Sequence, residues 1–179
     1  MYESRVVRRW CVALALLLAV AVPLSAKHKH KAPPPKTAGN TASGFDPARD
    51  PAKDLQDAVA EATRTKKRIL MEVCGDWSIY CNLMENAFNE HPKLQRVRDM
   101  YYVTVKVHYS KDHPNEAFLS HYPPVPDYPH FFVLDSNGTL LLSQPTRKFE
   151  QGKKYNVGKI EDFLKKDSHP PIHLFNVVK

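Results

Sequence analysis

The stretch RILMEVCGDWSIYCNLMENAF, residues 68–88, limits what this chain can fold into more than any other part of the sequence. Residues 69–74 form a short apolar run that ends at a Gly-Asp pair, which indicates a buried strand followed by a turn. A helical pattern begins at Ser78. Cys74 ends the predicted strand, and Cys81 lies about one turn into the predicted helix. The sequence therefore predicts a strand–turn–helix unit with a cysteine on either side of the turn.

The first 26 residues are typical of a secretory signal peptide. Three arginines precede an apolar run at 11–24 that is short for a membrane span, and Ala26 suits cleavage. Leu24 is an unusual residue two positions before that cleavage site, so an uncleaved signal that anchors the chain to a membrane stays a second hypothesis. After cleavage the chain keeps two of its three cysteines, Cys74 and Cys81. In an oxidising compartment such a pair tends to form a disulfide where geometry allows.

Composition narrows the class of function. The chain has 179 residues, of which 25% are charged, and this suits one folded domain with its own core. The net charge is +7, and the excess of +5 that remains without residues 1–26 is spread along the chain, with a local concentration at 27–31. We therefore expect a solvated basic surface and no nucleic-acid partner. The sequence contains no phosphate-binding glycine loop, zinc-spaced cluster or hydrolase elbow. We therefore expect neither a metal nor a cofactor.

The pattern of apolar, proline and glycine residues organises the chain. It predicts a signal peptide at 1–26, a disordered Lys/His/Pro-rich linker at 27–45, a folded domain at 46–167 and a C-terminal tail at 168–179. Within the domain, it predicts helices at 51–64, 78–97, 114–122 and 157–166, and strands at 69–74, 101–107, 130–135 and 139–143. Pro92 either kinks the second helix or begins a new one. Strand–helix–strand crossovers imply parallel pairing, and the last two strands form a hairpin. We therefore predict an α/β fold with a mixed sheet of about four strands flanked by helices.

The residues from Gly75 to Cys81 resemble the active-site region of the thioredoxin superfamily, in which a strand leads into Trp-Cys-x-x-Cys at a helix N-terminus. They are most similar to thioredoxin-like proteins of bacterial envelopes that carry Gly-Asp-Trp-Cys-x-x-Cys. The resemblance extends over 50–167 and implies a thioredoxin-like fold and a periplasmic location. This chain reads Trp77-Ser78-Ile79-Tyr80-Cys81, so serine stands where the family has its attacking cysteine.

Two further positions match the family. Tyr128-Pro129 precedes the strand at 130–135, and the resemblance implies a cis-proline there that forms a substrate groove with Trp77. Glu72 matches the buried acid that relays protons to the second cysteine, with Lys106 as a candidate partner. A structural ion pair is the alternative role for Glu72. His130, next after the proline, is a further candidate neighbour of Cys81, although a lone histidine is more often structural.

Because a serine cannot form a disulfide, Ser78 removes the family's usual first step and leaves three hypotheses. In the first, Cys74 and Cys81 form a redox pair, and the chain is a thiol–disulfide oxidoreductase acting on protein thiols or disulfides, with an envelope redox partner. In the second, Cys81 forms mixed disulfides alone. In the third, the site is redox-inactive and the groove at Trp77, Tyr128 and Pro129 binds extended or unfolded polypeptide. The sequence does not decide whether the chain is an enzyme.

Overall fold

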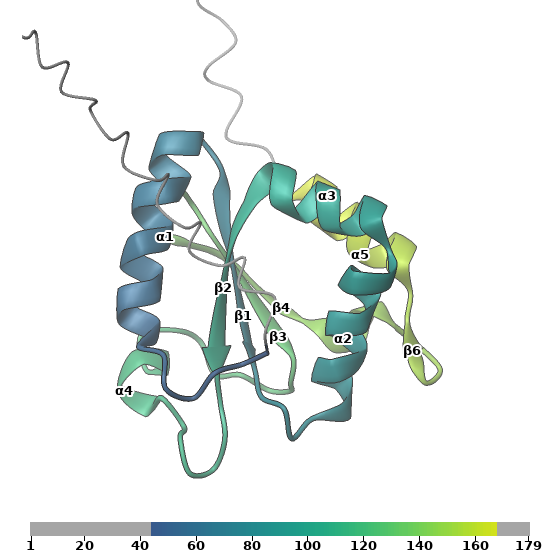
Figure 1. Ribbon diagram of the computed structural model, residues 1–179, viewed down its shortest axis with the longest axis horizontal. Coiled ribbons are helices and arrows are strands. Elements are labelled where there is room, and N and C mark those ends of the chain that lie inside the picture. The colour runs from purple at the N-terminus through teal and green to yellow at the C-terminus, as the bar shows by residue number, and fades with distance from the viewer. Residues whose placement is uncertain (1–43, 168–179) are drawn as a thin grey trace, which may run out of the picture. The chain divides into compact units, whose positions relative to one another are not determined.

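The computed structural model describes residues 44–167 (Figure 1). The predicted signal peptide, the C-terminal tail at 168–179 and all but the last two residues of the predicted linker lie outside these residues. Within the part of the chain that is described, no helix is both long enough and apolar enough to cross a membrane.

The centre of the domain is a four-stranded mixed sheet. Its strands are β1 (Arg68–Cys74), β2 (Tyr102–His108), β3 (His130–Leu134) and β4 (Leu140–Pro145), in the order β2-β1-β3-β4. β1 pairs parallel with β2 and antiparallel with β3, and β4 pairs antiparallel with β3. The predicted mixed sheet is therefore confirmed, with β1 in its interior.

Helices cover both faces of the sheet (Figure 1). The helices are α1 (Pro51–Thr65), α2 (Ile79–Glu90), α3 (Pro92–Tyr101), α4 (Glu116–Leu119) and α5 (Val157–Lys166). Apolar side chains of α1 pack on one face, and those of α2, α3 and α5 pack on the other. Pro92 begins a new helix, which resolves the two alternatives for the break between α2 and α3.

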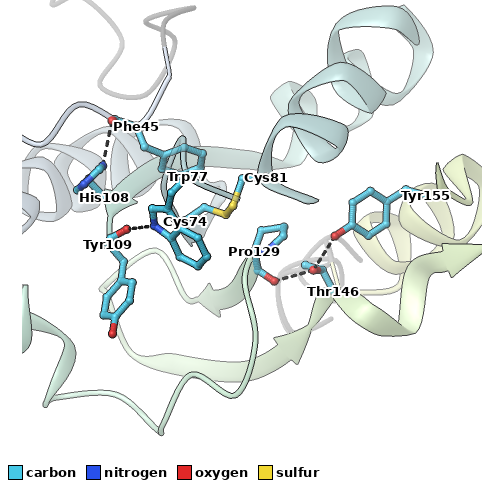
Figure 2. Close-up of a disulfide and its surroundings, with 9 residues drawn as sticks. All are labelled: Phe45, Cys74, Trp77, Cys81, His108, Tyr109, Pro129, Thr146 and Tyr155. Atoms are coloured by element: carbon cyan, nitrogen blue, oxygen red, sulfur yellow. Dashed lines mark hydrogen bonds between the residues drawn. A yellow bond between two sulfur atoms is a disulfide. The ribbon is translucent and has the colours of Figure 1, made fainter. Parts of the chain in front are cut away.

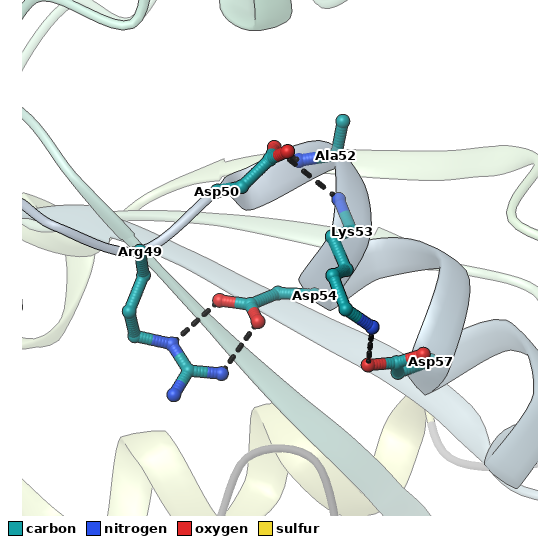
Figure 3. Close-up of polar contacts among 6 residues, drawn as sticks. All are labelled: Arg49, Asp50, Ala52, Lys53, Asp54 and Asp57. Carbon is teal, nitrogen blue, oxygen red and sulfur yellow. Dashed lines mark hydrogen bonds and ion pairs between the residues drawn. The ribbon is translucent and has the colours of Figure 1, made fainter.

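The predicted start of α1 is confirmed in detail (Figure 3). The Asp50 carboxylate accepts hydrogen bonds from the backbone N–H groups of Ala52 and Lys53, at 2.9 and 3.3 Å. These bonds satisfy donors that the first helical turn leaves free. Arg49 Nε donates to Asp54 at 2.6 Å, which joins the residue before the cap to the first turn. The chain therefore enters α1 through a well-defined corner.

Three parts of the fold differ from the sequence-based predictions. A 3₁₀-helix, η1 (Thr146–Phe149), and a small hairpin of β5 (Glu150–Gln151) and β6 (Lys154–Tyr155) precede α5. Two-residue strands are too short to show an alternating pattern, so the sequence gives no signal for them. The helix predicted at 114–122 is only the single turn α4. Tyr101, expected at the start of a strand, is the last residue of α3.

Candidate functional site

The turn between β1 and α2 is held against the end of β2. Trp77 Nε1 donates to the Tyr109 carbonyl at 2.6 Å, and the Tyr109 N–H donates to the Cys74 carbonyl at 2.7 Å. Gly75 lies between these contacts: a Cβ atom there would be 2.4 Å from the Tyr109 carbonyl oxygen and 2.6 Å from Trp77 Nε1. Only glycine fits this position without displacing backbone, so the Gly-Asp pair does more than break the strand.

Cys74 and Cys81 are joined by a disulfide across this turn (Figure 2). Their Cα atoms are 6.0 Å apart, within the range for such bonds. Cys74 ends β1, and Cys81 lies in the first turn of α2. The two residues are 0% and 1% exposed, so the bond is fully buried. The pair required by the first hypothesis is therefore present.

Ser78 occupies the N-cap position of α2 but does not act as a cap through its side chain. Its backbone is extended, and its hydroxyl makes no capping hydrogen bond to the helix. Its N–H donates to the Gly75 carbonyl at 3.1 Å, which closes the turn. The residue is only 7% exposed. Ser78 thus contributes backbone geometry to the site and no thiol chemistry.

Phe45 covers the disulfide, a role that the sequence analysis missed. It is 2% exposed and packs in one cluster with Cys74 and Cys81, with Tyr128 against the same cluster. His108 Nδ1 lies 3.1 Å from the Phe45 carbonyl and donates to it, as Figure 2 shows. The sequence places Phe45 at the end of the predicted linker, where a single aromatic after a polar, proline-rich run has no periodic partner. It belongs instead to the packed domain.

An exposed aromatic surface lies beside the buried sulfurs. Trp77 is 57% exposed, and its ring meets that of Tyr128 edge to face with centroids 5.5 Å apart. Tyr109 stacks on Tyr128 at a centroid distance of 4.5 Å. An open pocket of about 360 Å³ adjoins Trp77 and Tyr109 and is completed by Ser110, Lys111 and Asp112. The surface combines apolar faces with polar edges, which suits contact with another polypeptide.

The Tyr128–Pro129 peptide bond is cis, and its carbonyl is engaged within the domain. Thr146 Oγ1 donates to the Pro129 carbonyl at 2.6 Å, and the Tyr155 hydroxyl lies 3.2 Å from the same Oγ1 (Figure 2). Tyr155 belongs to β6, so the hairpin that the sequence did not predict helps to hold Pro129 in place. Burial raises the pKa of Tyr155, which keeps this hydroxyl neutral.

Glu72 lies on the strand face of Cys74, two residues before it, and is 1% exposed. It is in register with Lys106 on β2, but the Lys106 ammonium pairs with Glu85 of α2 instead. Lys106, one candidate partner for Glu72, is therefore paired with another carboxylate. Among the described residues, Glu72 Oε1 has no hydrogen-bond partner. Burial and then the nearby Glu85 carboxylate raise the pKa of Glu72 to about 8, so Glu72 holds a proton at neutral pH.

His130 is not a neighbour of Cys81. It pairs in register with Val73, so its side chain lies on the face of β1 opposite to Glu72 and Cys74. Its Nε2 is 2.8 Å from Ser143 Oγ on β4. Burial lowers the pKa of this imidazole, which favours its neutral form. The structural role that the sequence analysis gave as the more frequent one fits this position.

Comparison with known proteins agrees with the geometry. A family model described as thioredoxin-like matches residues 50–136. A disulphide isomerase from Xylella fastidiosa Temecula1 superposes with a TM-score of 0.62 and 20% identity, over 70% of this chain and 96% of that one. The C-terminal domain of DsbD from Neisseria meningitidis, in its oxidised form, gives a TM-score of 0.47 and 17% identity, over 70% and 99%. No curated protein matches the sequence significantly. The fold of this chain is thioredoxin-like.

Proposed function

We propose that this chain is a thiol–disulfide exchange protein of the thioredoxin superfamily in which Cys74–Cys81 is the exchangeable bond. The observation that carries the proposal is the disulfide itself. It joins the end of β1 to the first turn of α2. The resemblance of this segment to the superfamily's active-site region implies that Ser78 stands in place of the attacking cysteine. Cys74 would thus take over the role of the missing partner for Cys81. The likeness in fold to a protein described as a disulphide isomerase supports protein disulfides as the class of substrate.

The geometry suggests an order of bond changes. A thiolate of a substrate dithiol attacks the sulfur of Cys81, a mixed disulfide forms, and Cys74 leaves as a thiolate. The second substrate thiolate then attacks the substrate sulfur of the mixed disulfide and releases Cys81. The substrate loses two electrons to form a disulfide, and the protein pair is reduced. Release of Cys81 is favoured because amide groups at the N-terminus of α2 stabilise a thiolate in the first turn.

Glu72 supplies the proton in this scheme. Its pKa of about 8 keeps the carboxyl protonated at neutral pH, and it shares a strand face with Cys74. A buried thiolate on Cys74 is unfavourable, so transfer of the Glu72 proton to that sulfur stabilises the reduced pair. In the reverse direction Glu72 accepts the proton again. Glu85 and Lys106 act on this step through Glu72, because the Glu85 charge raises its pKa and the Lys106 charge lowers it.

Alkylation and mass measurement test the proposal. The purified protein should show Cys74 and Cys81 blocked as isolated and both modified after reduction, with a monomeric intact mass. Its reduction potential should then be measurable against glutathione. Cys81→Ala and Cys74→Ala should each abolish turnover in a disulfide-exchange assay, while Ser143→Ala, on the far side of the sheet at His130, should not. A wild type whose bond does not exchange with any thiol is incompatible with the proposal.

A second candidate function is the binding of extended or unfolded polypeptide without redox chemistry. The observation in its favour is the exposed Trp77 ring beside Tyr109, Tyr128 and the open pocket. An unfolded model polypeptide should change the Trp77 fluorescence and bind at least tenfold more weakly to Trp77→Ala. Binding that survives in Cys74→Ala/Cys81→Ala would favour this function, and binding that requires the disulfide would favour exchange.

The proposed location is the bacterial periplasm. The signal-like N-terminus, the resemblance to envelope proteins and the buried disulfide support it, because disulfides persist in oxidising compartments. Fractionation of cells that express the full chain tests this, with an N-terminal sequence beginning at Lys27 as the expected result for the released protein. Recovery of the chain with the membranes, with residues 1–26 still attached, would indicate the uncleaved anchor.

A further inference from the structure

We propose that Phe45 is a removable plug that controls which thiols can reach the Cys74–Cys81 disulfide. This inference rests on the proposed exchange function and adds an access-determining residue to it. Thiol–disulfide exchange needs a thiolate to approach a sulfur atom directly, so its rate depends on access to that sulfur. Both cysteines are almost fully buried, and Phe45 is the third buried member of their cluster. The folded protein therefore holds a reactive bond under a side chain that must move before the reaction begins.

The plug is supplied by a segment outside the strand–turn–helix unit that bears the cysteines. Phe45 lies before α1, whereas Cys74 and Cys81 belong to β1 and α2. Moving Phe45 therefore requires no change in the backbone of either cysteine. The base of the segment is fixed, because Asp50 caps α1 and Arg49 pairs with Asp54, as Figure 3 shows. The Arg49 N–H also donates to the Asp46 carbonyl at 3.3 Å, so the fixed base extends to Asp46 and the movement that uncovers the sulfurs is placed at Phe45 itself.

Within residues 44–167, few polar contacts hold the plug in place. The Phe45 carbonyl accepts one hydrogen bond from His108 Nδ1, and the Lys106 ammonium lies 5.3 Å from the ring centroid. The ring belongs to the cluster of Cys74 and Cys81, against which Tyr128 packs. Gly44 adopts φ +24°, and a Cβ there would lie 3.3 Å from Asp76 Oδ1, so glycine lets the chain pass close to the active-site turn. Burial of one aromatic ring corresponds to roughly a 10- to 100-fold preference for the closed state.

This arrangement predicts selectivity at the first chemical step. While Phe45 is seated, a soluble thiol such as glutathione cannot attack Cys81 to form the mixed disulfide and release Cys74. When the ring leaves, two glutathione molecules reduce the bond, the protein gains two thiols, and one glutathione disulfide is formed. A protein partner docked on the adjoining Trp77 and Tyr128 rings is well placed to displace Phe45, because Tyr128 belongs to both contacts. The plug thus slows reduction by small soluble thiols while it allows reaction with a docked protein partner.

The test compares reduction of the full chain by glutathione, followed by timed alkylation and mass measurement. Phe45→Ala should react about 10- to 100-fold faster than wild type. Phe45→Leu, which keeps an apolar plug, should stay within about threefold of wild type. Leu55→Ala is the matched control, because it removes an α1 side chain from the opposite apolar cluster without uncovering the sulfurs. It should leave the rate unchanged.

The equilibrium provides a readout that general loosening of the fold would not reproduce. A plug changes forward and reverse rates together, so the equilibrium with glutathione should differ by less than about threefold between Phe45→Ala and wild type. Equal rates for Phe45→Ala and wild type, or equal acceleration by Leu55→Ala, would overturn the proposal. If both wild-type thiols prove free as isolated, the exchange function fails instead. Maleimide labelling of Cys81 then tests the plug alone, with faster labelling of Phe45→Ala expected and an unchanged rate contradicting it.

Discussion

The two faces of β1 use the same seven-residue strand for different purposes. The side chains of Ile69, Met71 and Val73 point toward α1 and lie in a buried cluster made of apolar residues. On the other face, Leu70 joins a second apolar cluster, but Glu72 and Cys74 follow it. One face therefore carries only apolar side chains. The other begins with a core residue, Leu70, and continues with the two residues of the proposed site, Glu72 and Cys74.

This difference shows how the fold limits the destabilisation caused by burying Glu72. A buried carboxyl without a hydrogen-bond partner on Oε1 is unfavourable, and placing it in the middle of a core would also disturb packing on every side. Here it lies toward the end of an interior strand, next to the disulfide and to the Glu85–Lys106 pair. The α1 face supplies packing without interruption. We therefore expect changes on the two faces to respond differently to pH and to reduction.

The largest expected effect concerns pH and Glu72. Its pKa is raised to about 8 in the folded protein from 4.5, so the folded state keeps a proton that the unfolded chain has released. Its contribution to stability is therefore complete below about pH 4.5 and is lost progressively up to about pH 8. The full change corresponds to roughly 5 kcal/mol. Glu72→Gln should lack this fall, so its stability relative to wild type should rise between pH 4.5 and 8 in urea unfolding experiments.

A second substitution in the same site sharpens this prediction. Glu85→Gln removes a like charge beside Glu72 and frees the Lys106 ammonium from its present partner. Both changes favour the Glu72 carboxylate and so lower the pKa of Glu72 in the folded protein. The loss of stability with rising pH should therefore be smaller, and the variant should be more stable than wild type at neutral pH. Parallel pH profiles for wild type and Glu72→Gln would show that Glu72 is already ionised in the folded protein and would contradict its role as a proton donor.

On the apolar face, Met71→Ala should destabilise the protein by about 3 kcal/mol, because it leaves a cavity at a side chain that is 0% exposed. The loss should be the same at pH 5 and pH 8, and the same for the oxidised and reduced protein. Urea midpoints under these four conditions provide the measurement. A loss of stability that depends on the redox state would mean that the two faces of β1 are energetically coupled, which would contradict the contrast drawn between them.

The same contrast explains what the sequence could predict. Apolar runs, the Gly-Asp turn and the order of helices and strands suffice for the mixed sheet and for a cysteine on either side of the turn, because these depend on local patterns and crossover rules. The distance between Cys74 and Cys81 does not follow from these patterns. The register of Glu72 with Lys106 also follows from neighbouring strands. The partner of Lys106 does not, because Glu85 reaches it from a helix that crosses the sheet. Whether Lys106 pairs with Glu72 or with Glu85 depends on the distances between the side chains, which the sequence does not give.

Phe45 and Tyr155 show a second limit. Both meet the site from segments without periodic patterns: Phe45 from the residues before α1, and Tyr155 from a two-residue strand. Phe45 shares a cluster with Cys81, which is far from it in the sequence. Tyr155 is linked to Pro129, also distant in sequence, only through Thr146. A lone aromatic in a polar segment is the only signal available, and it does not identify the surface that the ring covers.

Reduction of the disulfide should have a smaller effect than Met71→Ala. The bond closes a loop with a sequence separation of only 7, so in the chain-entropy description it stabilises the fold by about 2.5 kcal/mol. Urea unfolding of oxidised and reduced protein measures this difference. Cys81→Ala should resemble the reduced form and should not respond to reductant. If reduction changes the midpoint of the Cys81→Ala variant too, the effect does not come from this bond.

The smallest expected effect comes from Ser78, and it compares two helix caps. The Asn156 side chain accepts from the Lys159 N–H at 3.0 Å at the start of α5, whereas Ser78 makes no such bond at the start of α2. Asn156→Ala should therefore cost about 1 kcal/mol, and Ser78→Ala less than about 0.5 kcal/mol, in urea unfolding. A cost of 1 kcal/mol or more for Ser78→Ala would mean that the hydroxyl supports the turn. A near-zero cost would mean that the turn depends on Gly75, the Trp77–Tyr109 hydrogen bond and the disulfide. Position 78 could then be substituted without loss of the fold.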